Sequence, residues 1–120
     1  MKTAIQFGGG NIGRGFIGAV LSQAGYRVVF ADVNQELLDR INRDGKYTVH
    51  VMDVEQKDIE ISNICAVNSG SQEVVDEIVN AEMITTAVGV RILRFVAPAI
   101  ANGIAARKAA GVEAPLNIVA

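Results

Sequence analysis

The sequence predicts an α/β protein built on a doubly wound, mainly parallel sheet with helices on both faces. Two observations carry this prediction. The strand pattern of residues 3–7 runs directly into the glycine spacing Gly8-x-Gly10-x-x-Gly13, and apolar strand and helix patterns then alternate along the chain. This order is typical of a Rossmann-type domain. The chain has 120 residues, 50% of them apolar, which suffices for one domain over residues 1–120 with its own core.

The glycine spacing predicts a loop that holds the phosphates of a dinucleotide. Gly8 allows a tight turn after the strand, Gly10 lets the backbone approach a pyrophosphate, and Gly13 lets helix and strand pack closely. The helical pattern that follows would direct its free N–H groups and its dipole at the phosphates. Gly25 is placed to cap this helix. Its apolar stripe consists of Ile12, Phe16, Ile17, Val20, Leu21 and Ala24.

An acid follows the second strand pattern, residues 27–31, at the position that binds the ribose in dinucleotide-binding folds. Asp32 lies 19 residues after Gly13, and a carboxylate there accepts hydrogen bonds from the ribose hydroxyls of NAD. It would repel the 2′-phosphate of NADP, and the three residues after it offer no arginine to compensate. The sequence therefore favours NAD. Asp32 also suits helix capping, and the two roles are compatible.

Residues 34–68 continue the alternation and then interrupt it. Asn34 is a good N-cap for a second helix, which has an inner face of Leu37, Leu38 and Ile41 and ends at Gly45. Three strand-like pieces follow, at residues 47–52, 59–61 and 64–67. We expect the first two to form a hairpin outside the main sheet and the third to join the parallel sheet.

The second half resumes the order of helix and strand. Ser69 or Ser71 would cap a helix that precedes a strand at residues 83–86. Beyond the strand come the small residues Ala87, Val88 and Gly89. An open parallel sheet binds its ligand at the carboxyl ends of the strands, so we expect these residues to line the nicotinamide half of the cofactor. An ordinary turn from strand to helix is the alternative. The inner face of the helix would be Val74, Val75, Ile78 and Val79.

A long helical pattern and a last strand pattern, residues 116–120, complete the chain. Pro98 lacks an N–H and interrupts the helical pattern, which predicts either a kink or two helices, the second beginning near Pro98. With the last strand, which we expect to be buried, the parallel strands number five, where a complete doubly wound dinucleotide fold has six. We therefore expect a truncated N-terminal fragment without a catalytic residue. The apolar stripe of the long helix is Ile92, Leu93, Val96, Ala97, Ile100, Ala101, Ile104 and Ala105.

The composition disfavours several classes of function. Cys65 is the only cysteine and His50 the only histidine, so we expect no internal disulfide, no metal site and no hydrolase triad. Cys65 is predicted to be a small buried hydrophobe. The net charge is −2 and the basic residues form no stripe, which disfavours nucleic acid as a partner. No apolar run has the length of a signal peptide core or a membrane span, so we expect a cytoplasmic protein.

A longer motif than the glycine spacing also marks the chain. The run FGGGNIGRGFIG at residues 7–18, followed by FADVN at residues 30–34, resembles the mannitol-1-phosphate 5-dehydrogenase family of the polyol-specific long-chain dehydrogenases. The similarity continues through VHV at 49–51, TTAVG at 85–89, APAIA at 97–101 and PLNI at 115–118. It covers essentially the whole chain.

This resemblance implies an enzyme that interconverts mannitol 1-phosphate and fructose 6-phosphate with NAD and without a catalytic metal. It also implies that a lysine general acid/base, with asparagine and histidine partners, belongs to a C-terminal substrate domain outside this sequence. The chain alone would then bind NAD but lack catalysis, and the sugar phosphate would bind only with that domain. Arg14 would reach a phosphate or remain solvated. The implied cofactor contacts are Phe7, Gly8, Gly9, Gly10, Asn11, Ile12, Gly13, Arg14, Asp32, Asn34, Thr86, Ala87, Val88 and Gly89.

Two other hypotheses use the same strand, loop, helix and acid. One is a non-catalytic nucleotide-sensing module that regulates a partner. The other is a methyltransferase that uses S-adenosylmethionine, whose glycine loop need not keep a glycine at the position of Gly13.

Overall fold

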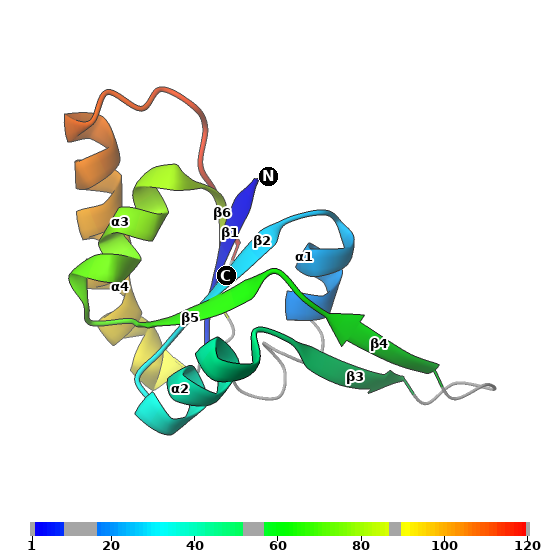
Figure 1. Cartoon of the computed structure of the whole chain (residues 1–120). Helices are drawn as coiled ribbons and strands as arrows, with labels where there is room; N and C mark the ends of the chain where they lie inside the picture. Colours follow the sequence, from blue (N-terminus) through cyan, green and yellow to red (C-terminus); the bar gives the residue numbers. More distant parts are fainter. Residues whose placement is uncertain (1, 9–16, 52–56, 87–89, 120) are drawn as a thin grey trace.

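The computed structural model describes residues 2–8, 17–51, 57–86 and 90–119, and its centre is a five-stranded parallel sheet in the order β5-β2-β1-β6-β7 (Figure 1). The strands are β1 (Thr3–Phe7), β2 (Arg27–Asp32), β5 (Ile64–Asn68), β6 (Ala81–Thr86) and β7 (Asn117–Val119). From β1 the chain winds outward through β2 to β5, and then crosses back to β6 and β7 on the other side of β1. This is the predicted doubly wound topology, whose strand order reverses between β1 and β6.

Helices cover both faces of the sheet, as predicted. α1 (Ala19–Gln23) and α2 (Gln35–Asp44) lie on one face, and α3 (Gln72–Asn80) and α4 (Val90–Ala109) lie on the other (Figure 1). Side chains alternate along β1, so Ala4 joins the core with α1 and α2, whereas Ile5 and Phe7 join the core with α3 and α4. All five side chains of β1 are buried. Burial on both faces is what the central strand of a parallel sheet requires.

The predicted helix ends of the first half are confirmed. Gly25 has a φ of 93° after α1, and its N–H donates to the carbonyl of Ser22 while that of Tyr26 donates to Leu21. This pair of bonds is a Schellman motif, and the positive φ favours glycine. Asn34 caps α2, because its Oδ1 accepts the N–H of Leu37 at 3.2 Å.

The excursion predicted between residues 46 and 62 is an antiparallel hairpin of β3 (Tyr47–Val51) and β4 (Lys57–Ile61), which projects from the side of the domain (Figure 1). Its base is anchored in the core. The ring of Tyr47 lies edge-on to that of Phe30, with 6.0 Å between the centroids, and Ile61 is fully buried. The third strand-like piece is β5, which joins the parallel sheet beside β2 as predicted.

The predicted inner face of α1 is partly wrong. Val20 is 51% exposed and Ala24 is exposed, whereas Ala19 and Leu21 are buried. Residues 17 and 18 form a wider π-helical turn, which rotates the following side chains relative to a regular 3.6-residue period. Ile12 and Phe16, the first members of the predicted stripe, lie outside the described residues.

The predictions for α4 and β7 also need correction. α4 continues through Pro98 as a single helix, so the alternative of two helices is wrong. Ile104 is 47% exposed, and its neighbours in the predicted stripe, Ala97, Ala101 and Ala105, face solvent too. Two members of the predicted stripe are confirmed, since Val96 is buried and Ile100 packs against the core, while the side chains of Ile92 and Leu93 lie outside the described ones. The buried line continues through Gly103 and Arg107, and Gly103 lies directly against Ile78 of α3. β7 is exposed rather than buried, since it is the edge strand and pairs with β6 alone among the described strands.

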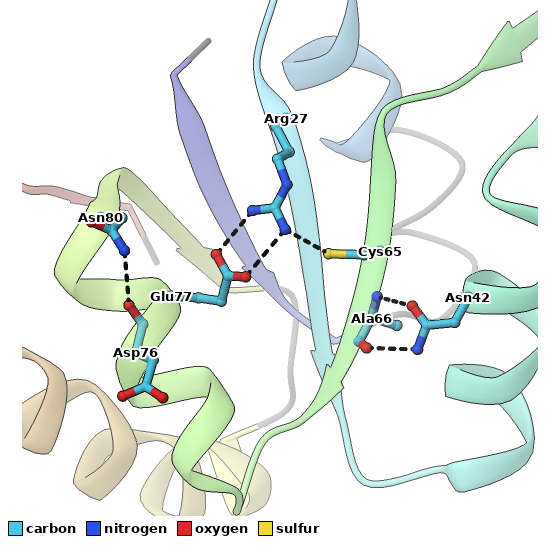
Figure 2. A network of polar contacts seen from close by, with 7 residues as sticks. All are labelled: Arg27, Asn42, Cys65, Ala66, Asp76, Glu77 and Asn80. Carbon is cyan, nitrogen blue, oxygen red and sulfur yellow. Dashed lines mark hydrogen bonds and ion pairs between the residues drawn. The ribbon is translucent and has the colours of Figure 1, made fainter.

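Three polar side chains join elements that are distant in sequence. Arg27 bonds Glu77 of α3, and Asn42 of α2 makes two bonds of 2.8 Å with the backbone N–H and carbonyl of Ala66 on β5 (Figure 2). Arg107, which is 6% exposed, donates to four carbonyls at 2.7 to 3.1 Å. These carbonyls belong to Ile78, Val79, Ala81 and Ala114. The buried guanidinium of Arg107 thereby caps the carbonyl groups at the C-terminal end of α3.

Candidate cofactor site

The chain leaves β1 at Gly8, whose backbone conformation is one that only glycine adopts easily. Gly8 has a φ of 99°, and its N–H donates to the carbonyl of Ala31 at 2.9 Å. The positive φ is consistent with the predicted tight turn off the strand, and the residues that would complete this turn lie outside the described residues. The preceding residue, Phe7, has a fully buried side chain in the core with α3 and α4. Among the predicted contacts, Phe7 therefore has only its backbone to offer a cofactor.

Asp32 ends β2 one residue beyond the partner of Gly8. Its Oδ1 accepts the N–H of Val33 at 2.7 Å and that of Asn34 at 3.1 Å, and its own carbonyl accepts the N–H of Ser69 at 3.0 Å. The carboxylate is thus fixed at the carboxyl edge of the sheet, where it is half-buried. The bond from Gly8 to Ala31 joins the end of β1 to the residue that precedes Asp32.

Asn34 lies two residues further on, exposed at the start of α2. Its side-chain oxygen is engaged in capping the helix. A cofactor contact of Asn34 stays a prediction, and the side-chain amide N–H groups are the donors that it would use.

Thr86 ends β6 on the other side of β1. Phe7 is in register with Ala31 of β2 and with Thr86 of β6, so the predicted segments meet at one edge of the sheet, at the point where the strand order reverses. A ligand binds an open α/β sheet at this point. The rest of the predicted contacts lie outside the described residues; they are Gly9, Gly10, Asn11, Ile12, Gly13, Arg14, Ala87, Val88 and Gly89.

Three residues of this edge were given no individual role from the sequence, although Gln6 lies in the segment from Thr3 to Arg14 that was expected around the pyrophosphate. Gln6 is a fully buried polar residue in the central strand, and the hydroxyl of Thr85 on β6 donates to its Oε1. The signal for Gln6 was present, because a polar residue interrupts an apolar strand. Asn68 ends β5 in register with Asp32, and its Oδ1 accepts the N–H of Gly70 at 2.8 Å.

Cys65 lies away from this edge, and its environment is that of a structural thiol. It is half-buried, and its Sγ accepts a hydrogen bond from Arg27 Nη2 at 3.3 Å (Figure 2). Burial raises the pKa of the Cys65 thiol, more than the charge of Arg27 lowers it. A raised pKa disfavours the thiolate, which is the reactive form.

Two further features bear on the kind of site. In the described part of the chain, no group of three or more His, Cys, Asp and Glu side chains comes together as a metal ion would require. Over the same residues, no helix combines the length and the apolar character needed to cross a membrane.

A cavity of about 280 Å³ lies between the start of α3 and the middle of α4, lined by Ser69, Ser71, Val75, Pro98 and Asn102 among others. It lies among residues of α3 and α4, which cover the face of the sheet opposite α1.

Comparison with known families agrees with this geometry. The family model described as the Rossmann domain of mannitol dehydrogenase matches residues 2–120. The match therefore includes the strand, the glycine turn, the acid and the switch point together.

Proposed function

The chain belongs to the mannitol dehydrogenase family, and we propose that it is the NAD-binding domain of a dehydrogenase that acts on mannitol 1-phosphate. Family membership makes the chain the Rossmann domain of an oxidoreductase with a nicotinamide cofactor. It favours this interpretation over the methyltransferase one. The preference for NAD is argued from Asp32, and the substrate from the resemblance carried by residues 7–18.

The placement of Asp32 is the observation that carries the preference for NAD. The two backbone N–H groups that bond its Oδ1 hold the carboxylate at the strand end, beside the turn at Gly8. A ribose with two hydroxyls can donate to such a carboxylate. A 2′-phosphate in the same place would put like charges in contact, which costs about 4 kcal/mol at 4 Å in a partly solvated site.

Calorimetric titration of the chain with NAD and with NADP tests this proposal. We expect NAD to bind at least about tenfold more tightly, since a small part of that repulsion suffices for such a ratio. Asp32→Asn keeps an oxygen that can accept the N–H groups of Val33 and Asn34 but removes the charge. This substitution should weaken NAD binding and reduce the difference between the affinities for NAD and NADP.

Asp39→Asn is the matched control, because Asp39 is an exposed carboxylate on α2 that accepts a hydrogen bond from Gln35. It should leave both affinities unchanged. NADP binding equal to or stronger than NAD binding would overturn the assignment, and so would equal effects of the two substitutions.

The residues described at this edge fit a binding role. When bound, NAD supplies the hydride acceptor or, in its reduced form, the donor. The chain would supply the glycine turn, the carboxylate of Asp32 and the end of β6 at Thr86, which together fix the cofactor's orientation. Asp, Asn and Thr are the polar side chains described at the strand ends beside Gly8. Their roles as hydrogen-bond partners fit cofactor binding, and we expect the chain alone to bind NAD without oxidising the polyol.

Turnover assays separate binding from catalysis and test the substrate. Purified chain with NAD and mannitol 1-phosphate should give no NADH, although it binds NAD in the calorimeter. Any longer natural form of the protein should reduce NAD with mannitol 1-phosphate and much more slowly with mannitol. A preference for unphosphorylated mannitol would overturn the substrate while leaving the cofactor assignment intact.

A further inference from the structure

The most unusual residue of the sheet is Gln6. It lies on the central strand with 0% of its surface exposed, at a position where its neighbours along the strand are apolar. In the sheet register it is opposite Thr85 of β6, which is 7% exposed. Burying an amide and a hydroxyl is costly unless each finds a partner, so this pair needs an account.

Every hydrogen-bonding group of the Gln6 amide is engaged. The hydroxyl of Thr85 donates to Oε1. Nε2 donates to the carbonyl of Phe7 at 2.9 Å and to that of Gly8 at 3.3 Å. The side chain therefore links β6 to the carbonyl of Phe7, the last residue of β1, and to that of Gly8, the first glycine of the predicted phosphate loop.

These bonds clamp one peptide group from both ends. The peptide that joins Phe7 to Gly8 has its carbonyl held by Gln6 and its N–H held by Ala31 of β2, each at 2.9 Å. A trans peptide is planar, so fixing both groups fixes the plane. The bond from Gln6 to the Gly8 carbonyl then also restrains ψ of Gly8, and with it the direction in which the chain leaves the strand.

The pair also lies on the relevant face of the sheet. Side chains on one face alternate with those on the other, so Gln6 shares a face with Ala4, which packs in the core with α1. On β6, Thr85 likewise shares a face with Met83, which packs against the same core. The clamp therefore lies on the face of the sheet that α1, the first described helix after the glycine spacing, covers.

We propose that Gln6 and Thr85 are a positioning pair for the dinucleotide-binding turn: they set the direction of the Phe7–Gly8 peptide and thereby the affinity for the cofactor. The inference rests on the proposed function for its ligand. Neither residue is expected to touch the cofactor. Filling the core alone would need no polar group, because apolar residues of similar volume satisfy such positions at equal or lower cost.

Hydrogen exchange of single amides tests the clamp without any cofactor. Gln6→Met keeps the length of the side chain and removes all three bonds, and Thr85→Val keeps the shape and removes the hydroxyl. Both should speed exchange of the Gly8 amide, by about tenfold for Gln6→Met and less for Thr85→Val. The Arg27 amide, which bonds Lys2 at the other end of the same strand pair at 2.8 Å, is the internal control and should keep its rate.

Calorimetry with NAD tests the consequence, on protein that circular dichroism shows to be folded. Gln6→Met should weaken NAD by about tenfold and Thr85→Val by a few-fold. Thr85→Ser keeps the hydroxyl and should bind like the parent chain. The matched control is Thr3→Val, because Thr3 is an equally buried threonine on β1 at the amino end, and it should leave the affinity unchanged.

The outcomes are distinguishable. Folded variants with unchanged Gly8 exchange and unchanged NAD affinity would overturn the positioning role. If the parent chain bound no dinucleotide, the proposed function would fail while the exchange data would still decide whether the clamp exists. If Gln6→Met did not fold, Thr85→Val, which leaves the amide in place, would decide both measurements.

Discussion

The guanidinium of Arg27, the first residue of β2, makes two parallel hydrogen bonds with the carboxylate of Glu77 on α3, at 2.9 and 3.1 Å (Figure 2). The hydrogen bond to Glu77 is the main reason that the pKa of Arg27 is raised. The two side chains are 38% and 25% exposed. The pair therefore ties a helix to the amino end of the sheet in a partly screened setting, away from the candidate site.

Glu77→Gln should lower the free energy of unfolding by about 1 kcal/mol in low salt, the upper part of the range for exposed pairs, because the geometry is bidentate. Urea unfolding at increasing NaCl should shrink the difference from the parent chain. Glu82→Gln is the control, since Glu82 pairs with Lys2 at 3.6 Å with both side chains more exposed. Its effect should be close to zero, and equal losses for the two variants would contradict the prediction.

Stability should fall at alkaline pH through Cys65. Burial raises its pKa, so at a pH just above the ordinary thiol value of about 8.5 the folded chain keeps a proton that the unfolded chain has lost. The folded state then binds more protons, and the free energy of unfolding decreases as pH rises through this window. In reducing buffer, the parent chain should lose more stability between neutral and alkaline pH than Cys65→Ala. Parallel pH profiles would show that another group is responsible.

Gly103→Ala should destabilise the chain although alanine favours helices. A Cβ at this position would lie 2.4 Å from Cγ2 of Ile78, in the contact between α4 and α3. Alanine gains about 1 kcal/mol of helix propensity, and forcing the helices apart costs about 1–3 kcal/mol, so we expect a net loss. Thermal unfolding measures it. Gly70→Ala is the control, because there the nearest atom, Asn68 Oδ1, lies at 3.4 Å, and a comparable loss in the control would argue against the clash.

Arg107→Met should be the most destabilising of these substitutions. It removes the donors for four carbonyls, at Ile78, Val79, Ala81 and Ala114, in a buried place that water reaches poorly. Unsatisfied buried groups cost about 1–3 kcal/mol each, and partial relaxation leaves an expected total of about 2–4 kcal/mol. Lys108→Met, the exposed neighbour in the same helix turn, should change little. Denaturant unfolding of both variants decides whether the buried cation stabilises the end of α3.

The topology was predictable because it depends on local patterns. The run from β1 to Gly8, the cap at Asn34, the turn at Gly25 and the hairpin of residues 47–61 each follow from a few adjacent residues, and the structure has all of them. The order of elements then leaves few possible sheets. Sequence reasoning also placed Asp32 at the strand end beside the turn, where the structure has it.

What was not predictable depends on residues far apart in the sequence. The predicted burial of Val20 and Ile104 is wrong, because a π-helical stretch sets the orientation of α1 and a close contact with Ile78 sets that of α4. Gln6 is hydrogen-bonded to Thr85, which lies 79 positions away in the sequence. Arg107 is hydrogen-bonded to carbonyls at the end of α3 that lie 26 to 29 positions away. No periodicity within either segment encodes such a pairing.

The two edge strands of the sheet, β5 and β7, differ in whether a side chain bonds their outward backbone groups, and Asn42 causes this difference. Its side-chain amide occupies the outward N–H and carbonyl of Ala66 on β5 in the manner of a neighbouring strand. At this border an incoming strand would first have to break two bonds of 2.8 Å. Among the described residues, no side chain bonds the outward backbone groups of β7 in this way, and its Ile118 and Val119 are half-exposed. Pairing of a further strand is therefore less costly beside β7 than beside β5.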